Sequence, residues 1–432
     1  MNAICLVIDR LHAGYLGAYG NSWIETPAAD RLAAESFVFD QALVDTPRLD
    51  LLYRSYWQGW PALVAQVPEN RPTLPGLLSD AGVATALLSD ERLVREHPLA
   101  VDFDEQVQVD PPWQPQMAAD EAFHETHLAR CFVQITDWLR QARGPFFLWC
   151  HLASLGTAWD APCEFRRRYW MEGDPEPTRS AEVPDLFLAE DHDPDEVLAY
   201  AQAYAGQVSL LDTCLSGLWE ALEEHPAAKE TCLMVTSPRG FPLGEHRRLG
   251  ACDEALYSEL VQVPLWIRLP DGLGAAARSQ ALVEPSDLWA TLLDCWRIAD
   301  VPRSPTAASL MPIVREEIAA VRDHLVLAGQ GRQRAIRTPA WYLRTGGASG
   351  EQGAGKPPDC IRGIAADPRA GGKSPELFVK PDDRWDVNNV AVRCLEVVEC
   401  LEDAMTQYEQ TVPSGRLSDL PPLPRVLVEG LE

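Results

Sequence analysis

The feature that most constrains the fold is a set of short apolar runs separated by long helical patterns. The runs lie at residues 3–8, 84–89, 146–151, 232–237 and 263–268. Uninterrupted runs of this length are typical of strands buried on both faces. The longest helical patterns between and after them lie at residues 121–143, 197–224 and 286–298. Strands that alternate with helices predict an α/β fold, with a largely parallel sheet between two layers of helices.

The sequence pattern changes after residue 312. Short strand candidates lie at 325–328, 334–337, 341–344 and 376–380, and a helical pattern runs from about 390 to 408. A stretch rich in glycine and proline at about 346–374 predicts a mobile loop. We therefore expect an α/β domain over residues 1–312, a small α+β subdomain over 313–411, and a proline-containing tail over 412–432.

Composition narrows the classes of partner. The 432 residues are 46% hydrophobic, enough for one large domain and a smaller one, and the formal net charge is -27. A surface this acidic repels phosphate backbones and anionic lipid, so neither nucleic acid nor a membrane surface is expected as a partner.

Location can also be addressed from the sequence. The first apolar run lacks the basic flank and the cleavage site of an export signal, and no run approaches the roughly 18 apolar residues of a membrane span. The eleven cysteines are scattered singly, without a CxxC pair. This usage is typical of reduced cysteines, so we expect a cytoplasmic protein.

Several blocks, in a fixed order, carry a resemblance to a known family. They read ICLVIDRLHAGYLGAYGN, TPAADRLAAESFVFDQA, RPTLPGLLSDAGVATALLSD, FFLWCHLASLGTAWDAP, TCLMVTSPRGFPLGEHRRLG and ELFVKPDDRWDVNNVA. Together they resemble the sulfatase family, a branch of the alkaline-phosphatase superfamily, over nearly the whole chain. The resemblance implies a mainly parallel central sheet sandwiched by helices, with a small C-terminal subdomain of antiparallel sheet and helix.

The resemblance also implies a divalent cation held by carboxylates, yet most of the matching positions have changed. Where the family has two adjacent aspartates after its first strand, this chain has Asp9 and Arg10. The family's second metal-binding pair, an aspartate followed by histidine or asparagine, falls on Pro238 and Arg239. Proline cannot ligate, and a guanidinium has no lone pair to offer a metal. Because Ca²⁺ takes about six to eight oxygen ligands, Asp9 alone predicts no bound metal.

The family's nucleophile is a matured cysteine or serine a fixed distance before a glycine that here resembles Gly59. Counting back from Gly59 reaches Leu49, which has a charged residue on either side. Leucine is not a nucleophile, so no catalytic residue is assigned. Thr46 and Ser55 are the nearest hydroxyls. They remain open as unusual nucleophiles, although ordinary loop and helix roles are favoured.

Other positions of the family's site have changed as well. Its Lys-x-His after the second strand aligns with Asp90 and Arg92, and its later histidine falls on Gly156. The lysine after its Gly-Glu-His block falls on Ala251. His151 lies at a strand end where the family also tends to have histidine.

A different metal site is an open alternative. The histidines nearest the inherited site are His12, His151 and His246. Two of them could bind a transition metal together with Asp9 or Asp90.

The substitutions at the matching positions have a common feature: each arginine replaces an acid or an imidazole that binds metal in the family. Loss of the cation would leave Asp9 as a buried unpaired charge, at a cost of several kcal/mol. A guanidinium can satisfy that carboxylate with two parallel hydrogen bonds, so the first interpretation is a salt bridge that plugs the old site. The second interpretation is an anion-binding pocket formed by Arg10, Arg48, Arg54, Arg92 and Arg239.

We therefore predict a catalytically degenerate sulfatase homologue that acts through binding or assembly. No cofactor is expected, and the partner is an anionic small molecule or a protein, with the oligomeric state open. The alternative is an active sulfuric- or phosphoric-ester hydrolase that uses Ca²⁺ or Mg²⁺ at an unorthodox site. An arginine paired with Asp9 would favour the first prediction. A cation at Asp9, with Thr46 or Ser55 beside it, would favour the second.

Overall fold

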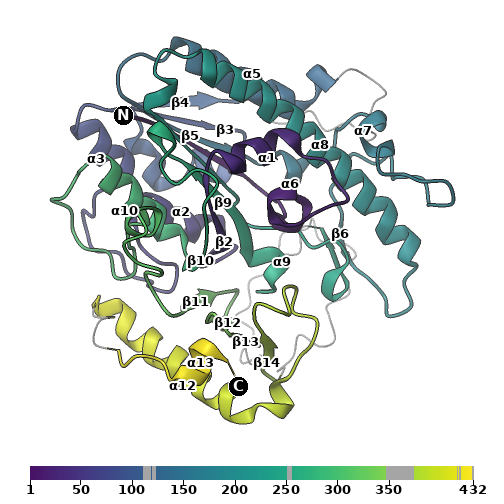
Figure 1. Cartoon of the computed structure of the whole chain (residues 1–432), viewed down its shortest axis with the longest axis vertical. Helices are drawn as coiled ribbons and strands as arrows, with labels where there is room; N and C mark the ends of the chain where they lie inside the picture. Colours follow the sequence, from purple (N-terminus) through teal and green to yellow (C-terminus); the bar gives the residue numbers. More distant parts are fainter. Residues whose placement is uncertain are drawn as a thin grey trace.

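The computed structural model describes residues 1–109, 118, 123–250, 255–346, 374–415, 417 and 420–430. Figure 1 shows a large central sheet covered by helices, with the C-terminal strands and helix at the lower end of the molecule. Within the part of the chain described here, no helix combines the length and the apolarity that a membrane crossing requires.

The central sheet has eight strands in the order β10-β2-β9-β7-β1-β5-β3-β4. Their bounds are β1 (Asn2–Ile8), β2 (Phe37–Leu43), β3 (Ala84–Ser89), β4 (Glu105–Gln108), β5 (Phe146–Leu152), β7 (Thr231–Thr236), β9 (Gln262–Arg268) and β10 (Arg278–Val283). Strand β9 runs antiparallel to β2 and β7, and the other neighbours are parallel. The largely parallel sheet is thereby confirmed, and the five expected strands fall within one residue of their positions.

Strand β1 shows why these runs are apolar throughout. Ala3, Cys5 and Val7 belong to the hydrophobic cluster on one face of the sheet. Ile4, Leu6 and Ile8 belong to the cluster on the other face. Since successive side chains of a strand point to opposite faces, a strand covered on both sides has no position for a polar residue.

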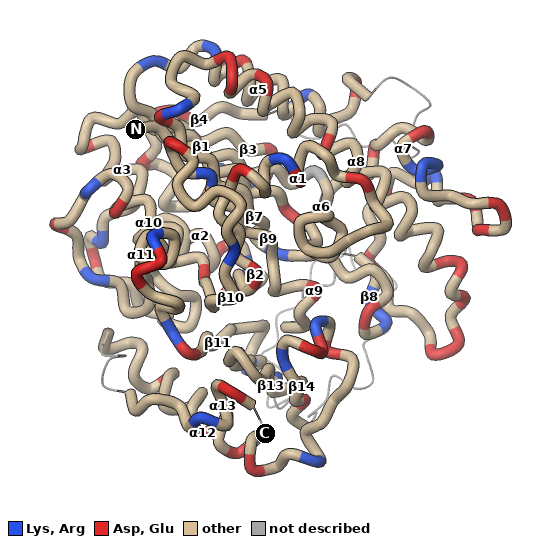
Figure 2. Tube along the Cα trace, viewed as in Figure 1, with Lys and Arg blue, Asp and Glu red and all other residues tan. Residues whose placement is uncertain are grey.

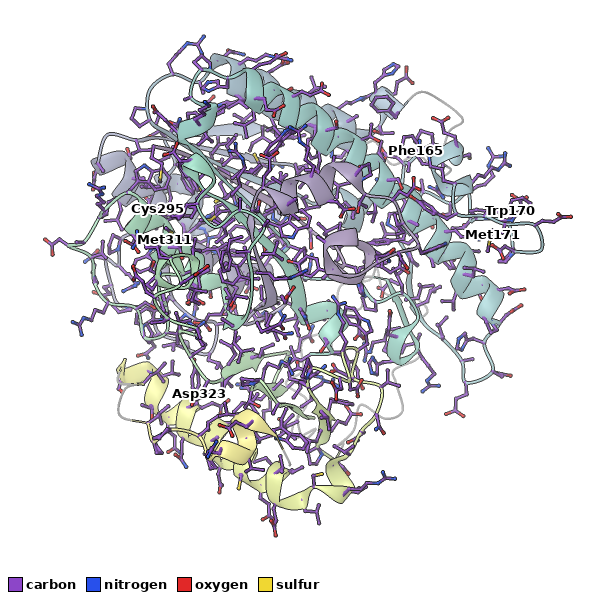
Figure 3. All side chains as sticks on the ribbon, in the orientation of Figure 1. Phe165, Trp170, Met171, Cys295, Met311 and Asp323 are labelled. Carbon is purple, nitrogen blue, oxygen red and sulfur yellow. The ribbon has the colours of Figure 1, made fainter. Side chains whose placement is uncertain are left out.

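Helices cover both faces (Figure 1). On one face, α1 (Pro27–Ala34) and α5 (His127–Gln141) each pack against α8 (Pro194–Glu224). On the other face, α3 (Leu74–Asp80) and α10 (Pro285–Cys295) each pack against α2 (Leu49–Gln58). Cys295 lies against Met311 of α11 (Met311–Val314), with 3.7 Å between the sulfur atoms (Figure 3). Acidic residues are spread along the helices and loops rather than gathered in one region (Figure 2).

Two helix starts differ from expectation because of their caps. Helix α5 begins at His127 rather than near residue 121, since the Thr126 side chain accepts a hydrogen bond from the backbone N–H of Ala129. Helix α8 begins at Pro194, three residues earlier than expected, after the capping residue Asp193.

The second sheet is antiparallel, in the order β11-β12-β13-β14. Its strands are β11 (Leu325–Ala328), β12 (Arg334–Arg337), β13 (Trp341–Thr345) and β14 (Glu376–Val379). Helix α12 (Leu395–Thr411) packs on this sheet and begins later than predicted, because Ala391–Arg393 forms a separate 3-10 turn. The antiparallel sheet with its helix is thus confirmed. The domain boundaries after residues 312 and 411 remain predictions, and the expected loop at 346–374 lies almost entirely outside the described residues.

The remaining elements are short. They are α4 (Arg92–Arg95), α6 (Ser154–Thr157), α7 (Cys163–Arg167), α9 (Ser258–Val261), α13 (Arg425–Glu429), β6 (Asp185–Phe187) and β8 (Arg248–Gly250). The 3-10 turns are Ala13–Tyr15, Gly17–Tyr19, Pro98–Asp102, Phe123–Glu125, Ala228–Glu230, Glu245–Arg247, Pro270–Gly272, Ala391–Arg393 and Val412–Ser414.

Candidate functional site

The candidate site lies where the parallel strands β7, β1, β5 and β3 end. Asp9 and Arg10 follow β1, and Arg239 comes three residues after β7. His151 lies near the end of β5, and Asp90 follows β3. Since these strands are parallel neighbours, their carboxyl ends meet at one edge of the sheet, which is the usual place for ligands in α/β folds.

Asp9 is paired with Arg239. Nε of Arg239 donates to Oδ1 of Asp9 at 2.9 Å, and Nη2 donates to Oδ2 at 2.8 Å. Asp9 is 2% exposed. Burial raises the pKa of Asp9, but attraction and hydrogen bonding to Arg239, aided by Arg10 and His151, outweigh burial and lower this pKa to about 2. Asp9 is therefore ionised and fully engaged by a cationic side chain.

Arg10 places a second guanidinium beside the same carboxylate. Its Nε lies 3.9 Å from Oδ1 of Asp9, and the residue is 3% exposed. Its backbone has a φ of 66°, which is uncommon for a residue other than glycine. The N–H of Arg10 donates to the carbonyl of Arg239 at 3.1 Å, and its carbonyl accepts from the Tyr204 hydroxyl at 2.5 Å. These two hydrogen bonds hold the unusual backbone in place.

The absence of a side chain at Gly156 leaves space for the side chain of Arg10. A Cβ atom built at Gly156 would lie 2.8 Å from Cγ of Arg10, closer than such contacts tolerate. With Arg10 in this position, any side chain at position 156 would force Arg10 or the neighbouring backbone to shift.

His151 is a buried core residue. Its Nδ1 lies 2.6 Å from the Tyr53 hydroxyl, which accepts from Nε1 of Trp149 at 3.4 Å. The tautomer of the His151 ring decides which of the two atoms donates this hydrogen bond. Burial lowers the pKa of His151, despite the opposing charges of Asp9 and Asp90. His151 is therefore neutral at physiological pH.

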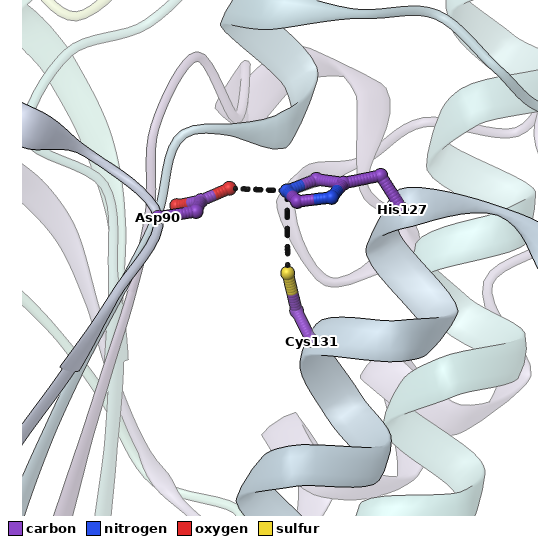
Figure 4. Close-up of side chains that lie close together, drawn as sticks. All are labelled: Asp90, His127 and Cys131. Carbon is purple, nitrogen blue, oxygen red and sulfur yellow. Dashed lines mark hydrogen bonds and ion pairs between the residues drawn. The ribbon is translucent and has the colours of Figure 1, made fainter. Parts of the chain in front are cut away.

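Asp90 belongs to a separate cluster with two residues that the sequence analysis missed. Its Oδ2 lies 2.9 Å from Nε2 of His127, and the same nitrogen lies 3.5 Å from Sγ of Cys131 (Figure 4). Its Oδ1 accepts from the backbone N–H of Ala153 at 2.7 Å. The signal for these two residues was their spacing of four within an expected helix, which places them on one face.

The other arginines of the expected pocket are engaged elsewhere. Arg92 is 77% exposed and pairs with Glu96, one turn later in the chain. Arg48 pairs with Asp50 on the surface, and Arg54 donates to backbone carbonyls in the loop after α2. Of the five arginines, Arg10 and Arg239 are the ones that lie against Asp9. The anion-binding pocket formed by Arg10, Arg48, Arg54, Arg92 and Arg239 therefore stays a prediction, and Arg48, Arg54 and Arg92 have other partners in this structure.

Leu49, where the sequence resemblance predicted the family's nucleophile position, is buried. Leu49 is the first residue of α2 and is 4% exposed within the hydrophobic core. Thr46 and Ser55 have no exposed surface. The Ser55 hydroxyl donates to Oδ2 of the buried Asp45 at 2.6 Å. Both hydroxyls are thus enclosed in the protein interior, and their hydrogen bonds among the described residues go to groups other than Asp9.

The histidines of the alternative metal site are each bound to other groups. Nδ1 of His12 accepts from the N–H of Gly14 at 2.8 Å, and burial lowers the pKa of His12 to about 4. The ring nitrogens of His246 lie 2.8 Å from the carboxylate of Glu259 and 2.8 Å from the carbonyl of Asp386. Neither histidine joins Asp9 or Asp90 in a metal-capable group among the described residues, so this alternative is corrected.

The residues around Asp9 do not fit the divalent cation that the family uses. One carboxylate faces two guanidinium groups, and Pro238 is a buried residue without a donor atom. Ala251 lies outside the described residues.

Comparisons with known proteins agree with the fold. The family model described as Sulfatase matches residues 1–298. The N-acetylglucosamine-6-O-sulfatase of Bacteroides thetaiotaomicron is 33% identical over 119 residues, which cover 27% of this chain and 21% of that protein. The iduronate 2-sulfatase of Homo sapiens is 22% identical over 329 residues, which cover 57% of this chain and 56% of that protein.

A solved structure extends the likeness to nearly the full chain. The phosphonate monoester hydrolase of Agrobacterium radiobacter superposes with a TM-score of 0.70 at 17% identity, covering 97% of this chain and 96% of that chain. The chain spans about a fifth to just over half of the length of the two curated relatives. The match over residues 1–298 and the shared architecture establish that the chain belongs to the sulfatase family.

Proposed function

We propose that this chain is a catalytically degenerate member of the sulfatase family that acts through binding or assembly rather than ester hydrolysis. The observation that carries the proposal is the pair between Arg239 and Asp9, with hydrogen bonds of 2.9 and 2.8 Å. Ester hydrolysis of the family's kind needs a cation that polarises the sulfuryl or phosphoryl oxygens. Here a guanidinium binds both oxygens of the single remaining carboxylate.

Charge gives a second reason. Arg10 and Arg239 together place two positive charges against the one negative charge of Asp9. A dication brought to this point would be repelled by both guanidinium groups. It would also have to displace Arg239, and breaking a buried pair costs about 3–5 kcal/mol.

The position of the family's nucleophile gives a third reason. Leu49 is buried in the core, and the nearby Ser55 is fully enclosed and hydrogen-bonded to Asp45. A substrate ester would find neither a nucleophile nor a polarising cation at this edge of the sheet.

The C-terminal strands favour a protein as the binding partner. Three apolar side chains between β14 and the start of α12 are largely exposed: Val387 (82%), Val392 (81%) and Leu395 (62%). Strand β14 ends the order of its sheet, and the segment that follows it pairs with its outer edge, since the backbone of Leu377 bonds to Asn389 and Val390. Exposed apolar side chains gathered in one surface segment are typical of surfaces that another chain covers.

The test is a hydrolase assay with a matched control. Aryl sulfate, aryl phosphate and aryl phosphonate esters are offered with Ca²⁺, Mg²⁺ or Mn²⁺ to the wild-type protein and to Asp9→Asn. The proposal predicts rates that are indistinguishable between the two proteins and from the buffer. A metal-stimulated rate that Asp9→Asn abolishes would overturn the proposal and establish the active hydrolase.

A further inference from the structure

A second cluster of metal-ligating side chains lies apart from the Asp9–Arg239 pair. We propose that Asp90, His127 and Cys131 form a binding site for a divalent transition metal ion, with zinc as the preferred ion. This inference does not depend on the proposed function, because none of these residues touches Asp9 or Arg239 through a hydrogen bond or ion pair.

The geometry points to one shared ion. The three donor atoms are Oδ2 of Asp90, Nε2 of His127 and Sγ of Cys131, and all lie within 4.8 Å of one another. Figure 4 shows the imidazole nitrogen facing both the carboxylate and the thiol. Zinc bonds of about 2.0–2.3 Å in a tetrahedron place donor atoms roughly 3.3–3.8 Å apart. The observed separations of 2.9 and 3.5 Å approach this arrangement.

The same geometry argues against a catalytic triad. In a Cys-His-Asp triad the acid binds one ring nitrogen and the thiol faces the other. Here Asp90 and Cys131 both face Nε2 of His127. A single nitrogen cannot pass a proton between the two groups, whereas a metal ion is bound by all three atoms at one point.

The donors are held in place by other contacts. Oδ1 of Asp90 accepts from the N–H of Ala153 at 2.7 Å, which leaves Oδ2 directed at His127. The backbone N–H of His127 donates to Oδ2 of Asp160 at 2.6 Å and fixes the first turn of α5. Cys131 follows one turn later on the same helix face. Such outer contacts are typical of the support that metal ligands receive.

The donor set selects the metal. A thiolate, an imidazole and a carboxylate together suit zinc, whereas Ca²⁺ and Mg²⁺ prefer oxygen ligands alone. The ligands are nearly enclosed, with exposures of 6% for Asp90, 8% for His127 and 0% for Cys131. Burial raises the pKa of the Cys131 thiol, so metal binding must release its proton and must strengthen as the pH rises.

Cobalt titration tests the proposal. Protein stripped with a chelator is titrated with Co²⁺, and a thiolate-to-cobalt charge-transfer band is followed. We expect one equivalent of Co²⁺, displaced by Zn²⁺, with the band absent in Cys131→Ser and the affinity reduced at least tenfold in Cys131→Ser and His127→Gln. The matched control is Cys400→Ser, which removes an exposed cysteine of α12 and should leave the band unchanged.

Three results of the band measurement would each overturn the site. They are the absence of a charge-transfer band in the folded wild-type protein, a band that persists in Cys131→Ser, and a band that Cys400→Ser removes. Asp9→Asn separates this site from the inherited one, since its band should equal that of the wild type. A cobalt signal that requires Asp9 and not Cys131 would also contradict the proposal. Circular dichroism establishes that each variant is folded.

Discussion

Arg239 binds both carboxylate oxygens of Asp9, through Nε at 2.9 Å and Nη2 at 2.8 Å, at the end of the first strand of a sulfatase fold. The guanidinium keeps the carboxylate ionised in a buried position. Under the proposed function, this pair takes the place of a metal ion at the end of β1.

The first prediction concerns how much the Asp9–Arg239 pair contributes to the free energy of unfolding of the protein. Asp9→Asn and Arg239→Met should each destabilise the protein by about 3 kcal/mol, because each leaves a largely buried charge without its main partner. The loss of unfolding free energy in the double variant should be clearly smaller than the sum of the losses in the two single variants. Urea unfolding of the four proteins measures the coupling. Additive losses would show that the two residues do not depend on each other.

The second prediction concerns the loss of stability at acidic pH. The pKa of Asp9 is lowered in the folded state to about 2, from an ordinary value of 3.8. The stability that its ionisation supplies is therefore fully present above about pH 4 and is lost as the pH falls through 2. The loss is on the order of 2 kcal/mol. Urea unfolding between pH 2 and 5 should show this slope in the wild type, and a smaller slope in Asp9→Asn. Equal slopes in the two proteins would contradict the assignment.

The third prediction has the opposite sign and concerns Asp45. Burial, with a further contribution from the charge of Glu284, raises its pKa from 3.8 to about 7. Its neutral form stabilises the fold fully below about pH 4, and this stability is lost as the pH rises through 7. Asp45→Asn should remain uncharged and flatten the pH dependence of the free energy of unfolding between pH 4 and 8. A variant as pH-dependent as the wild type would refute this role.

The fourth prediction concerns the fit between Gly156 and Arg10. Gly156→Ala should destabilise the protein by about 1–3 kcal/mol, because the new Cβ would meet Cγ of Arg10 at 2.8 Å. Adding Arg10→Ala should recover part of that loss. Gly217→Ala in α8 is the matched control, since a Cβ there meets nothing within 4 Å. Thermal unfolding of these variants measures the effect, and a loss that Arg10→Ala does not relieve would exclude the steric cause.

The strands buried on both faces were predictable, whereas β2, β4 and β10 of the same sheet were not. The run at 3–8 is apolar throughout because both of its faces are covered. Strand β4 is mostly polar and largely exposed. Strand β2 contains Asp40 and Gln41, and β10 begins with exposed polar residues, so neither produced a continuous apolar run. Pairing along the sheet, which the sequence pattern does not encode, makes these segments strands.

The candidate site was predictable to a similar degree. The chemistry of an acid that follows a buried strand made an arginine partner for Asp9 foreseeable. The dependence of Arg10 on Gly156 and the cluster of Asp90 with His127 require the positions of α5 and α6 relative to the sheet. Those positions are set by packing between elements far apart in the chain, which no local pattern reports.

Calcium and magnesium binding, measured by isothermal titration calorimetry, tests the central claim most directly. The wild-type protein, Asp9→Asn and Cys131→Ser are titrated after removal of bound metal, so that any zinc at the Asp90 cluster is distinguished from a cation at Asp9. If Arg239 has replaced the family's cation, none of the three proteins binds Ca²⁺ or Mg²⁺ with the heat of a specific site at millimolar concentrations. One equivalent bound by the wild type and by Cys131→Ser, but not by Asp9→Asn, would contradict the account.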